Sequence, residues 1–518
     1  MTRSTARLAG GSASTTRSSV TLDELAAVLG MSIPQELGRI AVAGVHDDSR
    51  AVEPGDLYLA FPGRRVHGLD FEDQARARGA VAVLSDRPGS VLPTIVVPDP
   101  RRAAGPLSAH LHGYPSSTMG VYGITGTNGK TSTAYLLGAA LAGAGECVGT
   151  ITGISTDGPR STAVSTRTTP EAATLQRSLA RFRDEGATVV AMEVSSHAAA
   201  QRRVDGTEFA AMGFTNLGPD HLDFHGSMED YFAAKSALFE TDRTRAAAIG
   251  IDDHYGRRLA ASVEVPCWTF STHDSNADIF GDSIVCTATG TAFEARTPHG
   301  TFDIHLPLLG PHQVHNAVAA LALCAANAVD LAAAARGIDK VRTVPGRLER
   351  IDEGQSFLAI VDYMHNTSGQ RCLLPYLRTL TPGKIIIVLG ATGDRDPGKR
   401  FPLGAVAGAA ADIVIVSDES PFSEDSAVIR DAVAAGAVSA KHATVVVESD
   451  RRKAFALAVS QADDRDVVVA VGRGCDGFQT FGDVVVPFDD RVELRRAVLD
   501  DMVHRRQRRE SAGSASSM

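Results

Sequence analysis

The chain has 518 residues, 44% of them hydrophobic and 22% charged, which is the composition of a folded globular protein with about three domains. Its 51 lysines and arginines against 61 aspartates and glutamates give a formal net charge of −10, which argues against nonspecific binding to nucleic acid or to an anionic membrane. No stretch approaches the roughly 18 consecutive apolar residues of a membrane-spanning helix. The six cysteines form no CxxC pair, so we expect no zinc site and a reducing, cytoplasmic location.

The first part of the chain, residues 20–115, has the pattern of a small α/β domain. Residues 1–19 and 504–518 are rich in small polar or basic side chains and are expected to be disordered tails. Between Thr21 and Tyr114 the hydrophobic periodicity predicts a helix at Leu22–Leu29, an amphipathic segment at Phe71–Arg78, and strands at Ile40–Val45, Leu57–Phe61, Val81–Leu84 and Thr94–Val97.

The second part, residues 116–345, changes to strand, glycine loop and long helix, which predicts a P-loop ATPase-like parallel sheet. Apolar runs at Thr188–Val194 and Ala210–Phe214 indicate buried parallel strands, and each of them ends in a polar cluster. The segment Asp252–Phe302 is interrupted by glycine and threonine, so we expect an insertion of short strands there. A helix is expected at Val314–Ala326.

In the third part, residues 346–503, strands and alanine-rich helices alternate, which predicts a doubly wound, Rossmann-like parallel sheet. The expected strands are Phe357–Val361, Ile385–Leu389, Ile413–Val416, Thr444–Val447 and Val467–Val471.

A glycine-rich loop, Gly-Ile-Thr-Gly-Thr-Asn-Gly-Lys-Thr-Ser at 123–132, follows the first strand of the central domain and opens a helix. Glycines let backbone N–H groups turn toward phosphate oxygens, and the helix N-terminus adds positive potential. Lys130 would reach the outer phosphates, and the Thr131 hydroxyl could ligate Mg²⁺. Ile124 stands where the usual GxxxxGK[ST] spacing has its first glycine. We still predict a phosphate site here rather than a simple strand-to-helix turn.

A second group of polar residues follows the buried strands of the central domain. Glu193 and the Asp220–Asp223 cluster lie at or just past strand ends, where open α/β sheets gather their sites. Lys235 falls on the apolar face of a helix expected over Met228–Phe239. Either this lysine extends its amine to the rim, or it is buried and neutral, or CO₂ converts it into a carbamate that binds metal. The residues alone leave these alternatives open.

Taken together and in order, these motifs resemble the Mur ligase family, and within it the type that adds the third amino acid to a UDP-N-acetylmuramoyl dipeptide. The resemblance covers about Asp48 to Arg491. Its motifs are Asp48-Ser49-Arg50 with Pro54-Gly55-Asp56, Gly126–Thr131, Thr168-Thr169-Pro170-Glu171, Glu193-Val194-Ser195-Ser196-His197, Asn216-Leu217 with Asp220-His221-Leu222-Asp223, Pro345-Gly346-Arg347, and Gly393-Asp394-Arg395-Asp396 with Gly398-Lys399-Arg400.

The resemblance implies roles for individual residues. ATP would be held by Gly126, Thr127, Asn128, Gly129, Lys130, Thr131 and Ser132, with Arg347, Asp362 and His365 closing over it from the third domain. Two magnesium ions would be held by Thr131, Glu193, His221 and a carbamylated Lys235. The UDP-sugar and its peptide would contact Ser49, Arg64, Arg65, Val66, Thr168, Thr169, Ser195, Gln201 and Arg203. The incoming amino acid would contact Arg395, Asp418, Phe422, Gly472 and Asp476. Lys130, Glu193, His221, Lys235, Arg347 and His365 are the expected catalytic residues.

The implied reaction is ATP-dependent amide formation. ATP would phosphorylate a carboxylate to an acyl phosphate, a free amine would attack, and ADP and phosphate would leave. The expected partners are small molecules, and the expected state is a monomer. The alternatives are a paralogue that joins another acid and amine in specialised metabolism, a P-loop kinase or NTPase, and a non-catalytic homologue.

Departures from the family pattern gather in the third domain. The usual Asp-Tyr-Ala-His-Thr-Pro-Asp reads Asp-Tyr-Met-His-Asn-Thr-Ser at 362–368, and Gly-Lys-Gly-His-Glu reads Gly-Arg-Gly-Cys-Asp at 472–476. In the family's Asp-Asn-Pro-Arg loop, the arginine that recognises meso-diaminopimelate is replaced by Phe422. In the central domain, Arg167, Gly250 and Gln313 stand where asparagine is usual. Because a phenyl ring cannot replace a bidentate guanidinium, we predict an amino acid other than meso-diaminopimelate, the alternative being drift in a loop that still binds it.

Overall fold

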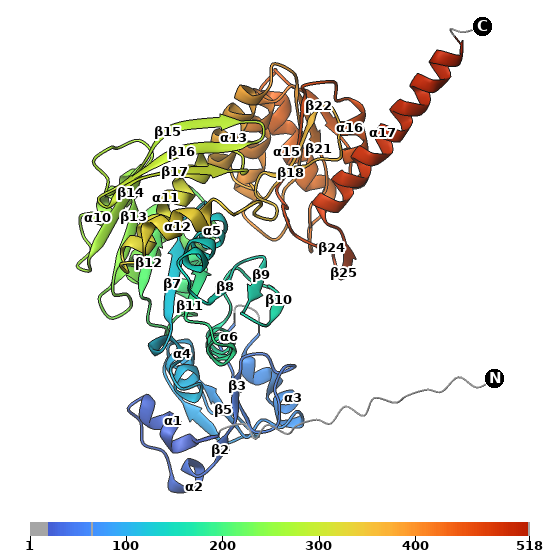
Figure 1. The fold of residues 1–518 in the computed structure, drawn as a ribbon. Helices are drawn as coiled ribbons and strands as arrows, with labels where there is room; N and C mark the ends of the chain where they lie inside the picture. The colour runs from blue at the N-terminus through green and yellow to red at the C-terminus, as the bar shows by residue number, and fades with distance from the viewer. Residues whose placement is uncertain (1–18, 64–65, 516–518) are drawn as a thin grey trace, which may run out of the picture. The chain divides into compact units, whose positions relative to one another are not determined.

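Mostly parallel sheets of four, eleven and six strands organise residues 19–63 and 66–515, the part of the chain that the computed structural model describes (Figure 1). These residues form two units. One contains the chain up to Pro115 together with 171–180 and 202–207, and the other contains 116–170, 181–201 and everything from Glu208 onward. The three-domain α/β class expected from the sequence is confirmed, whereas its exact domain boundaries stay a prediction.

The first unit is built on the parallel sheet β3-β4-β5-β6. Helix α1 starts with a capping box, in which the Thr21 hydroxyl accepts from the Glu24 N–H and Glu24 accepts in return. The strand expected at Ile40–Val45 is two strands, because Val42 pairs with β1 and Val45 with β4. The elements are β1 Val20–Thr21, α1 Leu22–Val28, α2 Gln35–Gly38, β2 Ala41–Val42, β3 Gly44–His46, β4 Asp56–Leu59, η1 Gly68–Phe71, α3 Glu72–Ala77, β5 Ala82–Ser85, β6 Thr94–Val96 and α4 Pro100–Leu111.

The eleven-stranded sheet has the order β10-β9-β8-β11-β7-β12-β13-β14-β15-β16-β17 and is parallel from β8 to β15. Its elements are β7 Gly120–Thr125, α5 Lys130–Gly143, β8 Val148–Ile151, β9 Ser155–Asp157, β10 Thr162–Val164, β11 Val189–Glu193, α7 Ser196–Ala200, β12 Ala211–Phe214, α8 Leu222–His225, α9 Met228–Ser236, η3 Ala237–Phe239, β13 Ala247–Gly250, α10 His254–Ala260, β14 Cys267–Ser271, β15 Ile279–Thr287, β16 Gly290–Thr297, β17 Gly300–Leu306, α11 His312–Ala325 and α12 Leu331–Ile338. Helix α6, Ala172–Glu185, has residues in both units.

One expectation for this sheet was wrong. The segment Asp252–Phe302 does not form a separate insertion of short strands, because its strands β14 to β16 continue the edge of the central sheet and β15 is nine residues long. The alternation of buried and partly exposed residues along β16 explains the pairing. Phe293 and Ala295 point into the core together with Ile304 of β17, and the intervening side chains point away from it.

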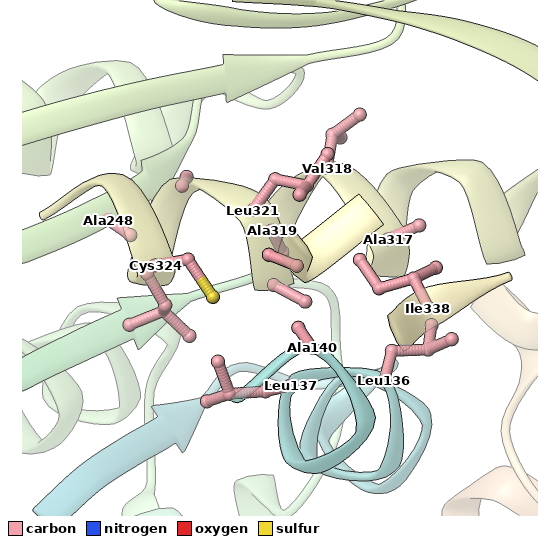
Figure 2. Close-up of a cluster of buried hydrophobic side chains, with 14 of the residues drawn as sticks. Leu136, Leu137, Ala140, Ala248, Ala317, Val318, Ala319, Leu321, Cys324 and Ile338 are labelled. Atoms are coloured by element: carbon pink, nitrogen blue, oxygen red, sulfur yellow. The ribbon is translucent and has the colours of Figure 1, made fainter. Parts of the chain in front are cut away.

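Helix α5, which begins at Lys130, is held by a core of small and branched side chains. Its Leu136, Leu137 and Ala140 pack against Ala317 and Cys324 of the alanine-rich helix α11, with Ile338 of α12 nearby (Figure 2). Small side chains let helices approach closely and leave few voids. The first turn of α5 is therefore fixed relative to the sheet, and the loop that precedes it starts from a rigid base.

The six-stranded sheet has the order β18-β19-β23-β20-β21-β22, and all pairs but β18-β19 are parallel. Separate hydrophobic cores cover its two faces, as expected for a doubly wound sheet. Its elements are β18 Glu349–Ile351, β19 Leu358–Asp362, α13 Thr367–Leu380, β20 Ile385–Leu389, η4 Pro397–Lys399, α14 Arg400–Ala410, β21 Ile413–Val416, α15 Ser426–Ser439, β22 Thr444–Val447, α16 Arg451–Ser460 and β23 Val467–Val471, followed by the hairpin β24 Phe478–Phe481 and β25 Val484–Pro487.

The C-terminal segment is helical, contrary to expectation. Helix α17 runs Asp490–Ala515 and includes most of the segment 504–518 that the sequence predicted to be disordered (Figure 1). Arg505 explains the continuation, because it pairs with Asp501 one turn earlier and donates to the Ala462 carbonyl at 2.6 Å. Of the helices in the described part of the chain, α17 included, none is both long and apolar enough to span a bilayer.

Candidate active site

The loop between β7 and α5 has the geometry expected of a phosphate-binding loop. Strand β7 continues through Thr125, which is why the buried Ile124 stands where the usual motif has a glycine. The turn is made instead by Gly126 at φ +142° and Gly129 at φ +89°. A Cβ at Gly126 would lie 1.9 Å from Thr215 Oγ1, and one at Gly129 would lie 2.4 Å from Asn316 Oδ1. Only glycine fits at either position.

Two lysines donate to a single carbonyl of this loop. Lys130 Nζ donates to the Gly126 and Thr127 carbonyls at 3.0 and 2.8 Å, and Lys235 Nζ donates to the Gly126 carbonyl at 2.8 Å and to Thr125 Oγ1 at 3.3 Å. Lys235 is 1% exposed, which excludes the alternative in which its amine reaches the rim. Burial, with the nearby charge of Lys130, holds the pKa of Lys235 well below its ordinary value. Both effects favour the uncharged amine over the ammonium.

Glu193 ends strand β11 as a buried carboxylate, 1% exposed. Its Oε1 accepts from the Gly153 N–H at 2.8 Å. The Thr169 hydroxyl donates to the Glu193 carbonyl at 2.9 Å and accepts from the Ser195 N–H at 3.0 Å. Ser195 in turn caps helix α7. The structure thus brings together Glu193 and two residues expected to bind substrate, Thr169 and Ser195.

His221 lies beside a carboxylate at the turn that precedes α8. It has φ +55°, and its N–H donates to Asp220 Oδ1 at 3.0 Å. Burial lowers the pKa of the His221 imidazole to about 3, although the charge of Asp220 acts in the opposite direction. The ring is therefore neutral near pH 7, which is the form that ligates metal.

Arg347 connects the third domain to the first turn of α5, just after the same loop, and Asp362 lies close behind it. Arg347 Nη2 donates to Thr131 Oγ1 at 2.9 Å, and its guanidinium lies 4.2 Å from the centre of the Tyr363 ring. Asp362 accepts from the Leu348 and Met364 N–H groups at 2.7 and 2.8 Å, and burial raises its pKa. Of the three third-domain residues expected to close over ATP, Arg347 bonds directly to Thr131, and Asp362 holds the N–H of Leu348, the residue that follows Arg347.

A small cavity of about 160 Å³ lies where the central and third sheets meet. It is lined by side chains of both parts, namely Pro219, Asp220, Leu222, Asn366, Thr367, Asp396, Gly398, Lys399 and Pro402. His365 lies at its edge, with Nε2 3.8 Å from Asp220 Oδ2, and burial lowers its pKa. The cavity places a lysine and two carboxylates beside the His221 turn.

The loops expected to hold the amino acid are fastened together at the carboxyl ends of β20, β21 and β23. Thr392 donates to Glu419 Oε2 at 2.9 Å, and a Cβ at Gly472 would lie 1.9 Å from Glu419 Oε1. Asp418 accepts from Arg430 at 2.5 Å, and burial raises its pKa. Arg473, the residue in the family's lysine position, is 2% exposed and lies 3.3 Å from Asp490.

Phe422, which stands in place of the diaminopimelate-binding arginine, is held by the β24–β25 hairpin. Its N–H donates to the Thr480 carbonyl at 3.1 Å, and its carbonyl accepts from Gly482 at 2.7 Å. The Arg395 guanidinium lies 5.9 Å from the centre of the Phe422 ring. Asp476 is exposed in the turn between β23 and β24, where its N–H donates to the Arg473 carbonyl.

The remaining predicted substrate residues divide between the two units. Ser49, Val66 and Arg203 belong to the first, where Ser49 Oγ donates to Gln74 at 2.6 Å and Arg203 pairs with Glu171 at 2.9 Å. Thr168, Thr169, Ser195 and Gln201 belong to the second. Arg64 and Arg65 lie outside the described residues.

Sequence reasoning missed several side chains that shape the loop. Asn216 accepts from the Asn128 N–H at 3.0 Å and donates to its carbonyl at 3.1 Å, while the Tyr231 hydroxyl lies 3.1 Å from Thr127 Oγ1. Asn366 and Ser368 contact Asn128 from the third sheet. Asn216 belongs to the Asn216-Leu217 motif, which could have identified it as a residue of the site. Tyr231 gave no such signal, because it resembled the other apolar residues of its helix.

Comparisons with known proteins agree with this geometry. The model of the Mur ligase middle domain matches residues 124–324, that of the Mur ligase glutamate ligase domain matches 346–474, and that of the Mur ligase family catalytic domain matches 41–107. A Streptomyces coelicolor protein named UDP-N-acetylmuramoyl-L-alanyl-D-glutamate–2,6-diaminopimelate ligase is 43% identical over 492 residues, which are 93% of this chain and 97% of that one. A UDP-N-acetylmuramyl-tripeptide synthetase of Leifsonia xyli is 38% identical over 494 residues, covering 92% and 95%.

Solved structures share the fold. A UDP-N-acetylmuramoyl-L-alanyl-D-glutamate–2,6-diaminopimelate ligase superposes with a TM-score of 0.63 at 27% identity and covers 94% of this chain and all of the other. The MurF ligase of Thermotoga maritima, solved with ADP, superposes with a TM-score of 0.62 at 20% identity and covers 88% and 96%. This second likeness concerns the fold alone.

Proposed function

The chain belongs to the Mur ligase family of ATP-dependent amide ligases, and from that premise we propose that it joins an amino acid other than meso-diaminopimelate to a UDP-N-acetylmuramoyl dipeptide. The assignment to ligases sets aside the kinase or NTPase considered from the glycine loop alone. The observation that carries the proposal is that the phosphate loop and the start of α5 contact residues of both the central and the third sheet. Arg347, for example, donates a hydrogen bond to Thr131.

The residues divide the work of the reaction. Lys130 and the N–H groups of the loop would bind the ATP phosphates, and Arg347 would neutralise charge on the transferred phosphoryl group. The two reactants, a carboxylate and a triphosphate, repel each other, so cationic groups are needed to bring them together. The carboxylate would take the terminal phosphoryl group of ATP, which forms an acyl phosphate and releases ADP. The amine would then attack the acyl phosphate, and phosphate would leave. The Thr169 hydroxyl donates to the Glu193 carbonyl and lies 3.5 Å from the Ser195 hydroxyl, and these two hydroxyls would orient the dipeptide.

Side chains around the loop carry oxygen and nitrogen atoms that could ligate magnesium. Thr131, Glu193, His221 and a carbamylated Lys235 would hold the metal, which when bound would neutralise phosphate charge. Among the described residues there is no group of three His, Cys, Asp or Glu side chains placed to bind a metal. A carbamate on Lys235 would supply a further anionic ligand: the uncharged amine is the form that reacts with CO₂, and the burial of this side chain favours that form.

The choice of amino acid rests on Phe422. The relatives are named as 2,6-diaminopimelate ligases, but the guanidinium fork expected to bind a distal carboxylate is absent from this position. A site built to hydrogen-bond a group discriminates strongly for it, and a phenyl ring offers no such bond. We therefore expect a side chain without that carboxylate. A paralogue acting on another acid and amine remains the second candidate, favoured by the changed loops at 418–425 and 472–476.

The experiment is a substrate panel. The protein is incubated with ATP, Mg²⁺ and UDP-N-acetylmuramoyl-L-alanyl-D-glutamate while the amino acid is varied, and phosphate release and product mass are recorded. We expect a tripeptide product with an amino acid other than meso-diaminopimelate. Efficient addition of meso-diaminopimelate would contradict the specificity. Product from none of the amino acids would favour the paralogue. The monomeric state and cytoplasmic location, also proposals, are checked by light scattering and cell fractionation.

A further inference from the structure

Asn366 is the residue directly before helix α13, where the eleven-stranded and six-stranded sheets meet. Its side chain uses its entire hydrogen-bonding capacity there. Its Oδ1 accepts from the Gly369 N–H at 2.8 Å and from Ser368 Oγ at 2.9 Å. Its Nδ2 donates to Asn128 Oδ1 at 3.2 Å and to Asp220 Oδ2 at 3.3 Å. A primary amide has two donors and two acceptor sites, so no capacity remains. The side chain is 4% exposed.

The two acceptors belong to separate parts of the candidate site. Asn128 lies in the phosphate loop, and its own amide also donates to Ser368 Oγ at 3.3 Å, so both ends of that side chain are held from the third sheet. Asp220 precedes His221 and accepts the His221 N–H on its other oxygen. One amide group of Asn366 thereby contacts the phosphate loop and the His221 turn at once.

The carbonyl end of Asn366 explains why its amide points that way. By accepting from Gly369, Oδ1 caps helix α13, and this fixes the plane of the amide relative to the third sheet. The N–H groups can then point only at Asn128 and Asp220. Because the bond to Asp220 is made to a carboxylate, it is stronger than a bond between neutral groups.

We propose that Asn366 is a positioning residue for the ligase reaction. Its side chain holds the phosphate loop and the His221 turn in fixed positions relative to the third domain. It touches no reacting atom. Its effect is exerted through Asn128 and Asp220, so its loss would weaken nucleotide binding and misalign the reacting groups while leaving the fold intact.

Two variants separate the donor from the cap. Asn366→Asp and Asn366→Ser both keep an oxygen that caps α13, and both lack the two N–H donors; the first also places a carboxylate against Asp220. A matched control is Asp450→Ser, which exchanges the cap of α16, where Asp450 accepts from the Arg452 N–H at 2.9 Å. Thermal unfolding of all three variants reports on the structural role.

The decisive readouts are ADP affinity by calorimetry, and KM for ATP against kcat. We expect both Asn366 variants to weaken ADP binding and raise KM for ATP by roughly 10- to 100-fold, the range for loss of a hydrogen bond to a charged group, with Asp450→Ser unchanged. Amide exchange at 126–131 and 218–223 should accelerate. ADP binding is measured without the other substrates, so the test stands even if the proposed amino-acid specificity fails.

Unchanged ADP affinity and exchange in both folded Asn366 variants would overturn the inference. So would a loss of affinity that merely follows a fall in melting temperature and is matched by Asp450→Ser, because Asn366 would then act only as a helix cap. If neither Asn366 variant folds, Ser368→Ala, which removes the second contact to Asn128, must itself weaken ADP binding and speed exchange at 126–131. Wild-type values for Ser368→Ala would refute the proposal in that case.

Discussion

Replacing Lys235 tests the carbamate most directly, and two variants of it separate chemistry from packing. Lys235→Met keeps the length of the buried chain and removes the nitrogen, whereas Lys235→Ala also opens space beside the loop. In the wild type the nitrogen donates to the Gly126 carbonyl at 2.8 Å and to Thr125 Oγ1 at 3.3 Å. Both variants lose these bonds, and neither can carry a carbamate.

The expected sizes of the two effects differ. Losing two hydrogen bonds costs about 1 kcal/mol each, and in Lys235→Met this is partly offset because the polar amine no longer has to be desolvated. Stability should therefore change by no more than about 2 kcal/mol. Turnover should fall by about 10²- to 10³-fold, the range for removing one group that stabilises transition-state charge. A large loss of activity with a small loss of stability identifies a chemical role.

The assay is substrate-dependent phosphate release, repeated with added formate or acetate. We expect a short carboxylate to restore part of the activity of Lys235→Ala, where space is available, and none in Lys235→Met, where the side chain fills it. Full activity of Lys235→Met would refute the carbamate. Rescue of both variants to the same extent would also count against it, because a bulk salt effect would then suffice.

Three further predictions concern other parts of the chain. Arg347→Lys should raise KM for ATP about tenfold, because an ammonium cannot both reach the loop and stack on Tyr363 as the planar guanidinium does; steady-state kinetics check this, and an unchanged KM would contradict it. Burial raises the pKa of Glu72, but N–H donors from residues 90–92 lower it by more, so the pKa in the folded protein is below its ordinary value. The Glu72 carboxylate therefore stabilises the fold above pH 4.5, and this stabilisation is lost on acidification below that pH. Glu72→Gln should lower the free energy of unfolding by about 1.5–3 kcal/mol at pH 7, and by progressively less toward pH 3, in urea titrations; a pH-independent difference would refute this. Arg451→Met should lower the free energy of unfolding by about 3 kcal/mol by the same method, because Asp490, 0% exposed, loses its 2.6 Å partner and keeps only Arg473 at 3.3 Å; an unchanged free energy of unfolding would contradict this.

Local signals in the sequence were sufficient for most elements and for the phosphate loop. The apolar face of the helix beginning at Met228 placed Lys235 among buried side chains, and the structure confirms its burial. The strands of the third domain were found because buried parallel strands read as continuous apolar runs. Such patterns depend on neighbours within a few residues, which is the range that periodicity reports.

Contacts between distant segments could not be predicted in the same way. Asn366 and Asp220 are separated by 146 residues and meet only because two sheets come together. The continuation of the central sheet through β15 and β16 depends likewise on a partner strand, as does the last part of α17 on the Ala462 carbonyl. In each case the local sequence allows more than one structure, and tertiary contacts select among them.

The shared carbonyl of Gly126 gives a physical reason for modification at Lys235. An ammonium on Lys235 would be repelled by Lys130, which donates to the same oxygen, and this repulsion together with burial lowers the pKa of Lys235. A carbamate on that nitrogen would instead be attracted to Lys130, because Lys130 would then face an anion. It follows that CO₂ should increase activity of the wild type and that depleting CO₂ should decrease it. Lys235→Met, which has no amine to modify, should be indifferent to both treatments.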